Sequence, residues 1–198
     1  MGGRMQSLVA ACCVAVAALA GFSSPAVGPA HAASCPPPPT VVHPFAPWSD
    51  TAGYVLTTGA SFEQGLAGWT LGSGASVADG NAPNALDAAT DSHSLYLPAG
   101  STATSPCTTA PHIVGIVRFF LKNVGASTGK LNIRVLVKGK TYEAGTIGAG
   151  GNWQPSEMLP SNAPNYSGAV AYQVQLTPVG TGAAFLVDDV YFDPYASR

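Results

Sequence analysis

Two adjacent carboxylates, Asp188 and Asp189, stand inside the apolar run FLVDDVYFDPY near the end of the chain. Charged residues make up only 9% of the sequence, so a pair of them in such a run needs a physical reason. They could act as an acid, a base or metal ligands, or they could mark where a strand meets solvent. Because neighbouring residues of a β-strand point to opposite faces of the sheet, we expect at most one of the two to face any given ligand.

The sequence offers little else that could form a catalytic centre. Glycoside hydrolysis uses two carboxylates about 5 to 10 Å apart in one cleft, which adjacent residues of a strand cannot provide. The chain also lacks a serine in a nucleophile elbow, a glycine-rich phosphate loop and a histidine pair at metal-ligand spacing. We therefore expect no enzymatic activity, and an enzyme is the least favoured of three functional classes.

Residues 1–33 show the order of features of a secretory signal peptide. Arg4 precedes the uncharged apolar run LVAACCVAVAALAGF, and the segment PAHA supplies a small-residue cleavage site. The run has about 15 residues, whereas a helix that spans a membrane needs about 20. We expect cleavage after Ala32 or Ala33, no membrane insertion, and export of the mature protein to the extracellular space or the cell envelope.

Charge and cysteine content narrow the class of the mature protein. After cleavage about 165 residues remain, a size that suits a single domain. Seven Lys and Arg then stand against ten Asp and Glu without a basic run, so nucleic acid is not an expected partner. Cys35 and Cys107 are the remaining cysteines, and an even pair in an exported protein favours a disulfide over two free thiols. This bond would tie a proline-rich arm, residues 34–52, to a domain at residues 53–195.

The domain has the texture of an all-β protein. Short apolar or alternating runs are separated by Gly, Pro, Asn and Asp, which is typical of strands and turns. The clearest predicted strands are residues 112–122, 130–139, 169–177 and 183–192. We predict a two-sheet antiparallel β-sandwich of the jelly-roll type, preceded by the signal helix and the proline-rich arm.

Strand alternation indicates a polar face on one sheet. If the clearest strands are neighbours, this face carries a row made of Arg118, Arg134, Gln173 and Gln175. The row is either an ordinary solvated face or a shallow site for a hydroxyl-rich ligand, because planar guanidinium and amide groups suit sugars. Exposed rings are a second mark of sugar binding, since they stack on pyranose faces. The candidate rings are Tyr142, Trp153 and Tyr166, with packing over a sheet edge as the alternative for each.

Two segments resemble the opening and closing motifs of carbohydrate-binding modules with a calcium-holding, galactose-binding-like jelly-roll fold. They are SFEQGLAGWTL, from Ser61 to Leu71, and FLVDDVYF, from Phe185 to Phe192. The resemblance implies a structural calcium ion held by one carboxylate from each end of the domain. By position its ligands would be Glu63 and one of Asp188 or Asp189. Calcium takes about six to eight oxygen ligands, which carboxylates, backbone carbonyls and water can supply together.

A second resemblance covers nearly the whole mature chain. The segments SLYLPAGSTATSPC and DDVYFDPY are similar to the hallmarks of a family of secreted actinobacterial proteins with a C-terminal DDVYxDPY motif. It implies the fold and the export of the chain but no activity. Members of that family commonly have Arg in the strand before TPVG, where this chain has Gln173 and Gln175.

Together these features predict a secreted, monomeric, non-catalytic protein that binds a polysaccharide or glycoconjugate. The alternative is a structural or adhesive protein of the cell envelope whose partners are proteins. The two differ in the surface they need: a polar groove with an exposed ring for a sugar, or a flat apolar patch for a protein.

Overall fold

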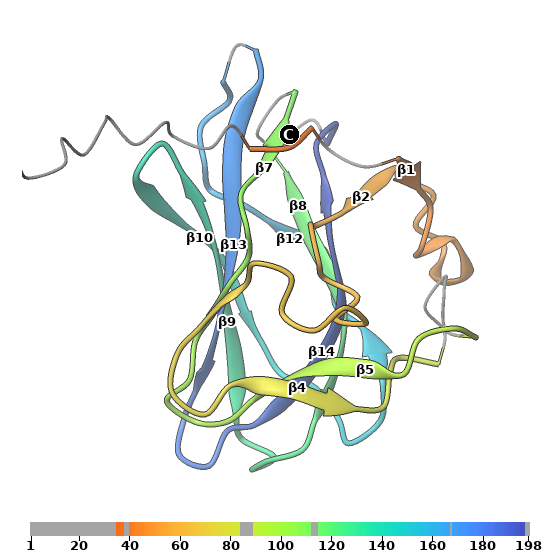
Figure 1. Ribbon diagram of the computed structural model, residues 1–198, viewed down its shortest axis with the longest axis vertical. Coiled ribbons are helices and arrows are strands. Elements are labelled where there is room, and N and C mark those ends of the chain that lie inside the picture. The colour runs from red at the N-terminus through yellow and green to blue at the C-terminus, as the bar shows by residue number, and fades with distance from the viewer. Residues whose placement is uncertain (1–34, 38–39, 84–88, 112–114, 167, 197–198) are drawn as a thin grey trace, which may run out of the picture. The chain divides into compact units, whose positions relative to one another are not determined.

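The computed structural model describes residues 35–37, 40–83, 89–111, 115–166 and 168–196. The predicted signal peptide, residues 1–33, lies outside these residues. The described residues form two antiparallel sheets and one short 3-10 turn, which confirms the predicted β-sandwich of the jelly-roll type (Figure 1). In this part of the chain no helix is long and apolar enough to cross a membrane.

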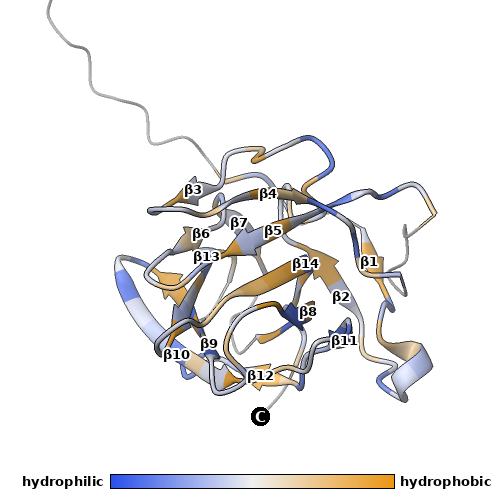
Figure 2. Ribbon diagram, turned by 90° about the horizontal axis from the view of Figure 1, so that it is seen from below, coloured by the Kyte–Doolittle hydropathy of each residue, from blue (hydrophilic) through white to orange (hydrophobic). Residues whose placement is uncertain are grey.

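The first sheet, sheet A, is organised around β14 (Phe185–Asp193). One edge of β14 pairs with β8 (Ile116–Asn123), and the other edge pairs first with β5 (His93–Leu97) and then with β2 (Tyr54–Leu56). Figure 2 shows β14 in hydrophobic colours along most of its length, with these strands beside it. The outer members of sheet A are β1 (Val41–Val42), β4 (Ser76–Asp79), β11 (Gln154–Pro155) and β12 (Leu159–Pro160).

The second sheet, sheet B, has β13 (Val170–Val179) at its centre. Along one edge, β13 pairs with β9 (Lys130–Val137), which in turn pairs with β10 (Lys140–Ile147). Along its other edge lie β7 (Thr108–Ala110) and β6 (Ala103–Thr104), and β6 also pairs with β3 (Thr70–Leu71). The four clearest strands predicted from alternation are therefore β8, β9, β13 and β14, but they belong to two different sheets.

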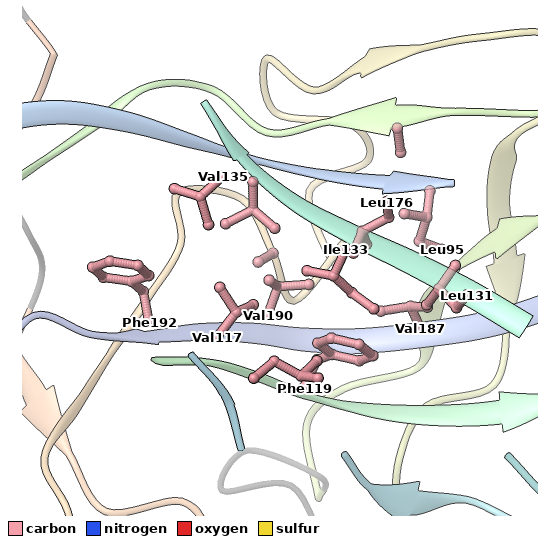
Figure 3. Close-up of a cluster of buried hydrophobic side chains, with 14 of the residues drawn as sticks. Leu95, Val117, Phe119, Leu131, Ile133, Val135, Leu176, Val187, Val190 and Phe192 are labelled. Carbon is pink, nitrogen blue, oxygen red and sulfur yellow. The ribbon is translucent and has the colours of Figure 1, made fainter. Parts of the chain in front are cut away.

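The main core fills the space between the sheets. Val117 and Phe119 of sheet A face Ile133 and Val135 of sheet B, and all four are fully buried (Figure 3). Tyr172 of β13 stacks on Phe192 of β14 with ring centroids 4.1 Å apart. Each large aliphatic or aromatic side chain that is removed from water contributes about 1.5 to 3 kcal/mol, so this apolar layer is what holds the two sheets together.

A β-bulge interrupts β14 at the two adjacent aspartates. The register with β8 shifts between Asp188 and Tyr191, and Asp189 has a left-handed backbone with φ 49°. The inward-facing core residues of this part of β14 are Val187, Val190 and Phe192. Two residues separate Val187 from Val190, where regular alternation would leave one, and this extra residue is the bulge. The expected strict alternation of Asp188 and Asp189 is therefore wrong at this position. The bulge lies where β14 changes its partner from β5 to β2.

The proline-rich arm covers the outer face of sheet A. Phe45, next to the 3-10 turn η1 (Ala46–Trp48), is fully buried among the rings of Tyr54, Phe120 and Tyr191. The start of the arm is joined to the domain by the predicted disulfide between Cys35 and Cys107, which the structure contains. A backbone hydrogen bond from Thr109 N to Pro36 O, 2.9 Å, supports the same junction.

Candidate functional site

The outer face of sheet B carries a row of polar side chains that crosses five strands. Strand register aligns the row, which consists of Glu143, Arg134, Gln175, Thr104 and Thr70. Gln173 lies two residues before Gln175 on the same face of β13, opposite Leu136 of β9. The structure thus brings together three of the four residues of the predicted polar row, namely Arg134, Gln173 and Gln175.

Arg134 is held in place by Glu143 from the neighbouring strand. Its Nε donates to Oε1 of Glu143 at 2.6 Å, while Nδ2 of Asn132 donates to Oε2 at 2.8 Å. The hydrogen bonds from Asn132 and then from Arg134 hold the pKa of Glu143 below its usual value, so the carboxylate is charged at neutral pH. Within the described residues, the terminal nitrogens of the Arg134 guanidinium make no hydrogen bond and remain available to a ligand.

Both glutamines use one amide proton within the sheet. Nε2 of Gln173 donates to the backbone oxygen of Ser105 at 2.8 Å, and Nε2 of Gln175 donates to Oγ1 of Thr104 at 3.2 Å. These bonds orient the two side chains and leave their carbonyl oxygens as acceptors. A sugar hydroxyl can donate to such an oxygen and accept from a guanidinium, so the row offers a ligand both hydrogen-bond acceptors and donors.

A hollow of about 330 Å³ lies at one end of this face. Leu136 and Gln173 lie in its lining, and the Cys35–Cys107 disulfide is on one side. The remaining lining residues are Val137, Lys138, Gly139, Lys140, Thr141, Ala171 and Tyr172. The hollow therefore offers apolar surface from Leu136 and the disulfide beside polar groups, which is the combination that small-molecule sites use.

Arg118 does not belong to the polar row, which corrects the sequence-based expectation. It lies on β8 in sheet A, where the arm buries it under Phe45 with the guanidinium carbon 4.0 Å from the ring centroid. Its Nη1 forms an ion pair with Asp50, and Nε and Nη2 donate to the backbone oxygen of Ser156 at 3.1 and 2.6 Å. The expectation was wrong because β8 pairs with β14 rather than with β9, so Arg118 anchors the arm.

The three candidate rings lie outside the polar row. Trp153 packs against the aromatic cluster on the outer face of sheet A. Tyr142 and Tyr166 pack against the main core, and their hydroxyl oxygens are 3.3 Å apart. The structure thus favours the packing interpretation for these rings, which leaves the polar row and the hollow as the candidate features of sheet B.

Asp188 is fully buried beside a second carboxylate. Its Oδ2 accepts a hydrogen bond from Ala82 N at 2.8 Å, and its Oδ1 accepts one from Asp189 N at 2.9 Å. Burial, and then the nearby charges of Asp189 and Asp91, raise the pKa of Asp188 to about 8. Carboxylates forced together in this way either take up a proton or gain stability from a cation.

Glu63 forms a separate arrangement with Ser92 and His93. Its Oε1 accepts hydrogen bonds from the backbone N of both residues, at 2.8 and 2.6 Å, and its Oε2 contacts Ser92 Oγ and His93 Nδ1 at 3.0 and 3.1 Å. Burial raises the pKa of Glu63, but these hydrogen bonds outweigh it and hold the pKa at about 2. The carboxylate thus clamps the start of β5.

Glu63 and Asp188 thus accept hydrogen bonds from different backbone groups, and a calcium site that uses them stays a prediction. No group of three or more His, Cys, Asp or Glu side chains in the described part of the chain has a geometry that could hold a metal ion. Asp188, Asp189 and Glu63 all offer the oxygen donors that calcium prefers. Both oxygens of Asp188 and both oxygens of Glu63 already accept hydrogen bonds from the protein.

Several residues of the site escaped the sequence-based analysis. These are Asn132, Leu136, Lys138, Lys140, Thr141 and Glu143. A usable signal was the dipeptide Lys138–Gly139, because a two-residue loop with glycine between alternating runs predicts a tight hairpin. Both turn residues have positive φ, 48° and 73°, and the resulting register places Glu143 opposite Arg134.

Comparisons with known proteins give similarity only at the level of solved structures. No protein-family model and no curated protein matches the chain. A family 61 carbohydrate-binding module, TmCBM61, in complex with β-1,4-galactotriose, has 16% identity and a TM-score of 0.45, over 68% of this chain and 94% of that chain. The CBM22-1 xylan-binding domain from Paenibacillus barcinonensis Xyn10C has 18% identity and a TM-score of 0.44, over 68% and 90%. A family 11 module from Clostridium thermocellum has 12% identity and a TM-score of 0.40, over 74% and 98%.

Proposed function

We propose that the protein is an exported, non-catalytic module that binds a polysaccharide or glycoconjugate on the outer face of sheet B. The observation that carries this proposal is the hollow of about 330 Å³ that continues into the row of Arg134, Gln173 and Gln175. The outer face of sheet A is covered by the arm, whereas this face presents oriented donors and acceptors to solvent.

The chemistry of the face suits a hydroxyl-rich ligand. Leu136 and the disulfide offer apolar surface to the C–H face of a sugar ring, and the carbonyl oxygen of Gln173 accepts from a hydroxyl. The guanidinium of Arg134 is already oriented by Glu143, so less side-chain entropy is lost when it binds.

A glycan array probed with the secreted protein tests this function. We expect binding to at least one class of polysaccharide, and we expect Gln173→Ala to weaken it about ten-fold, or about 1.4 kcal/mol. Gln154→Ala in β11 of sheet A is the matched control and should bind like the wild type. Circular dichroism would confirm that both variants fold. The absence of binding to every glycan on the array would remove the proposal.

We also propose that Asp188 and Asp189 bind a structural calcium ion together with backbone and water oxygens. The support is the burial of the two carboxylates and the repulsion that a cation would relieve. Glu63 is left out of this set because the hydrogen bonds from Ser92 and His93 already hold its pKa at about 2, whereas the pKa of Asp188 is raised. The ion would stabilise the bulge of β14 without taking part in sugar binding.

A further inference from the structure

Cationic residues are concentrated on one hairpin of the domain. The hairpin of β9 and β10 contains Lys130, Arg134, Lys138 and Lys140 against a single carboxylate, Glu143. The other described residues contain two cationic residues, Arg118 and Lys122, against eight carboxylates. Two of these four cations, Lys138 and Lys140, line the hollow, although the whole chain has a formal net charge of −2.

The positive charges of the two lysines that line the hollow, Lys138 and Lys140, are not neutralised by a described carboxylate. Lys138 and Lys140 belong to the lining of the hollow, and none of its lining residues is acidic. Lys138 Nζ lies 4.6 Å from the ring centroid of Tyr166, and neither lysine forms an ion pair with a described residue. By contrast, the buried Arg118 is paired with Asp50, and Arg134 is paired with Glu143.

Arg134 extends the cationic site along the sheet, because Glu143 contacts its Nε while its terminal guanidinium nitrogens stay open to a ligand. It stands two residues before Leu136 on the same face of β9, which corresponds to roughly 7 Å along the strand. This separation is close to the Debye length of about 8 Å at physiological ionic strength, so an anion in the hollow and one beside Arg134 both feel the charge of the hairpin.

We propose that the sheet-B site selects an acidic polysaccharide, with its anionic groups bound by Arg134, Lys138 and Lys140. This inference rests on the proposed function and names the class of its ligand. The anionic group is the carboxylate of a uronic acid or a sulfate ester. Because the net charge of the protein is negative, a polyanion is repelled elsewhere and is attracted only where the cations cluster. Three cations are also fewer than the 6 to 10 or so phosphate contacts of a protein that binds nucleic acid by its backbone.

Affinity electrophoresis in native gels tests the inference with polygalacturonate and dextran sulfate as acidic ligands and a neutral galactan as the reference. We expect at least one acidic polymer to bind about ten-fold more tightly than the galactan at low salt, with the difference shrinking as salt rises. The double variant Lys138→Gln/Lys140→Gln should lose this preference, and Arg134→Gln should weaken it. Lys122→Gln in β8 of sheet A removes one positive charge outside the site, and this variant should keep the preference for acidic polymers. The stronger of the two acidic ligands identifies the anionic group.

Three outcomes would overturn the inference, and they differ in whether the proposed function survives. Equal binding of neutral and acidic polymers, unchanged in the double variant, would remove the acidic preference and keep the proposed function. Binding to none of the polymers, together with a silent glycan array, would remove both. Equal retention on anionic lipid vesicles or duplex DNA would show a non-specific charge effect rather than recognition of an acidic sugar.

Discussion

At the scale of single residues, the environment of Asp188 is the least expected feature of the molecule. The ionised carboxylate of Asp188 has no exposed surface and is destabilised both by burial and by repulsion from Asp189 and Asp91. Its hydrogen bonds from Ala82 N and Asp189 N offset part of this cost. Two states relieve the remainder, which are a protonated Asp188 and a bound cation.

The raised pKa makes the stability of the protein depend on pH. Between about pH 4 and pH 8 the folded state keeps the proton of Asp188 while the unfolded state has lost it, so folding takes up a proton. In the presence of a chelator, we expect the free energy of unfolding to fall as pH rises through this window, by about 1 kcal/mol per pH unit. Urea unfolding at several pH values measures this slope.

The variant Asp188→Asn should remove most of that slope, because the amide cannot ionise. It also loses one of the two acceptor oxygens of Asp188, so at pH 5 we expect it to be less stable than the wild type by about 1 kcal/mol. The matched variant Asp79→Asn, at an exposed position on β4, should keep the slope of the wild type. A wild-type slope that persists in Asp188→Asn would show that another group titrates.

The calcium proposal predicts that the stability of the folded protein depends on calcium. We expect calcium to raise the melting temperature relative to chelator at pH 7, because the ion stabilises the ionised carboxylates of the folded state only. Asp189→Asn should lose this increase. Glu63→Gln should lower stability in both conditions and keep the increase, since Glu63 binds Ser92 and His93. Identical melting temperatures in calcium and chelator would remove the calcium site.

At the scale of secondary-structure elements, two local devices build the candidate site. The turn Lys138–Gly139 sets the register of β9 and β10, which places Glu143 beside Arg134. The disulfide joins the arm to the segment before β7 and forms one side of the hollow. The arm continues across the outer face of sheet A and buries Phe45 and Arg118.

Loss of the disulfide should affect both stability and binding. The two cysteines are 72 residues apart, and in the chain-entropy model closing a loop of that length stabilises the folded state by about 4 kcal/mol. We expect the double variant Cys35→Ser/Cys107→Ser to lower the free energy of unfolding by up to that amount in urea titration. Its affinity for the glycan should also fall, because one side of the hollow loosens. An unchanged affinity in the folded variant would exclude the disulfide from the binding site.

At the scale of the whole domain, the two outer faces of the sandwich have different roles. The arm closes the face of sheet A with an apolar cluster and an anchored arginine. Sheet B keeps a polar row, a hollow and most of the positive charge of the described chain. This division is why we place the ligand on sheet B.

The amino-acid sequence alone determined the all-β class, four of the five longest strands, the disulfide and the polar faces of β9 and β13. Each of these depends on local alternation or on residue type, which can be read without knowing strand neighbours. Only the tertiary structure decided that Arg118 lies in sheet A, that the candidate rings pack elsewhere and that a bulge places Asp188 and Asp189 together. These outcomes depend on which strands pair and where the arm lies, and such long-range contacts leave no trace in local periodicity.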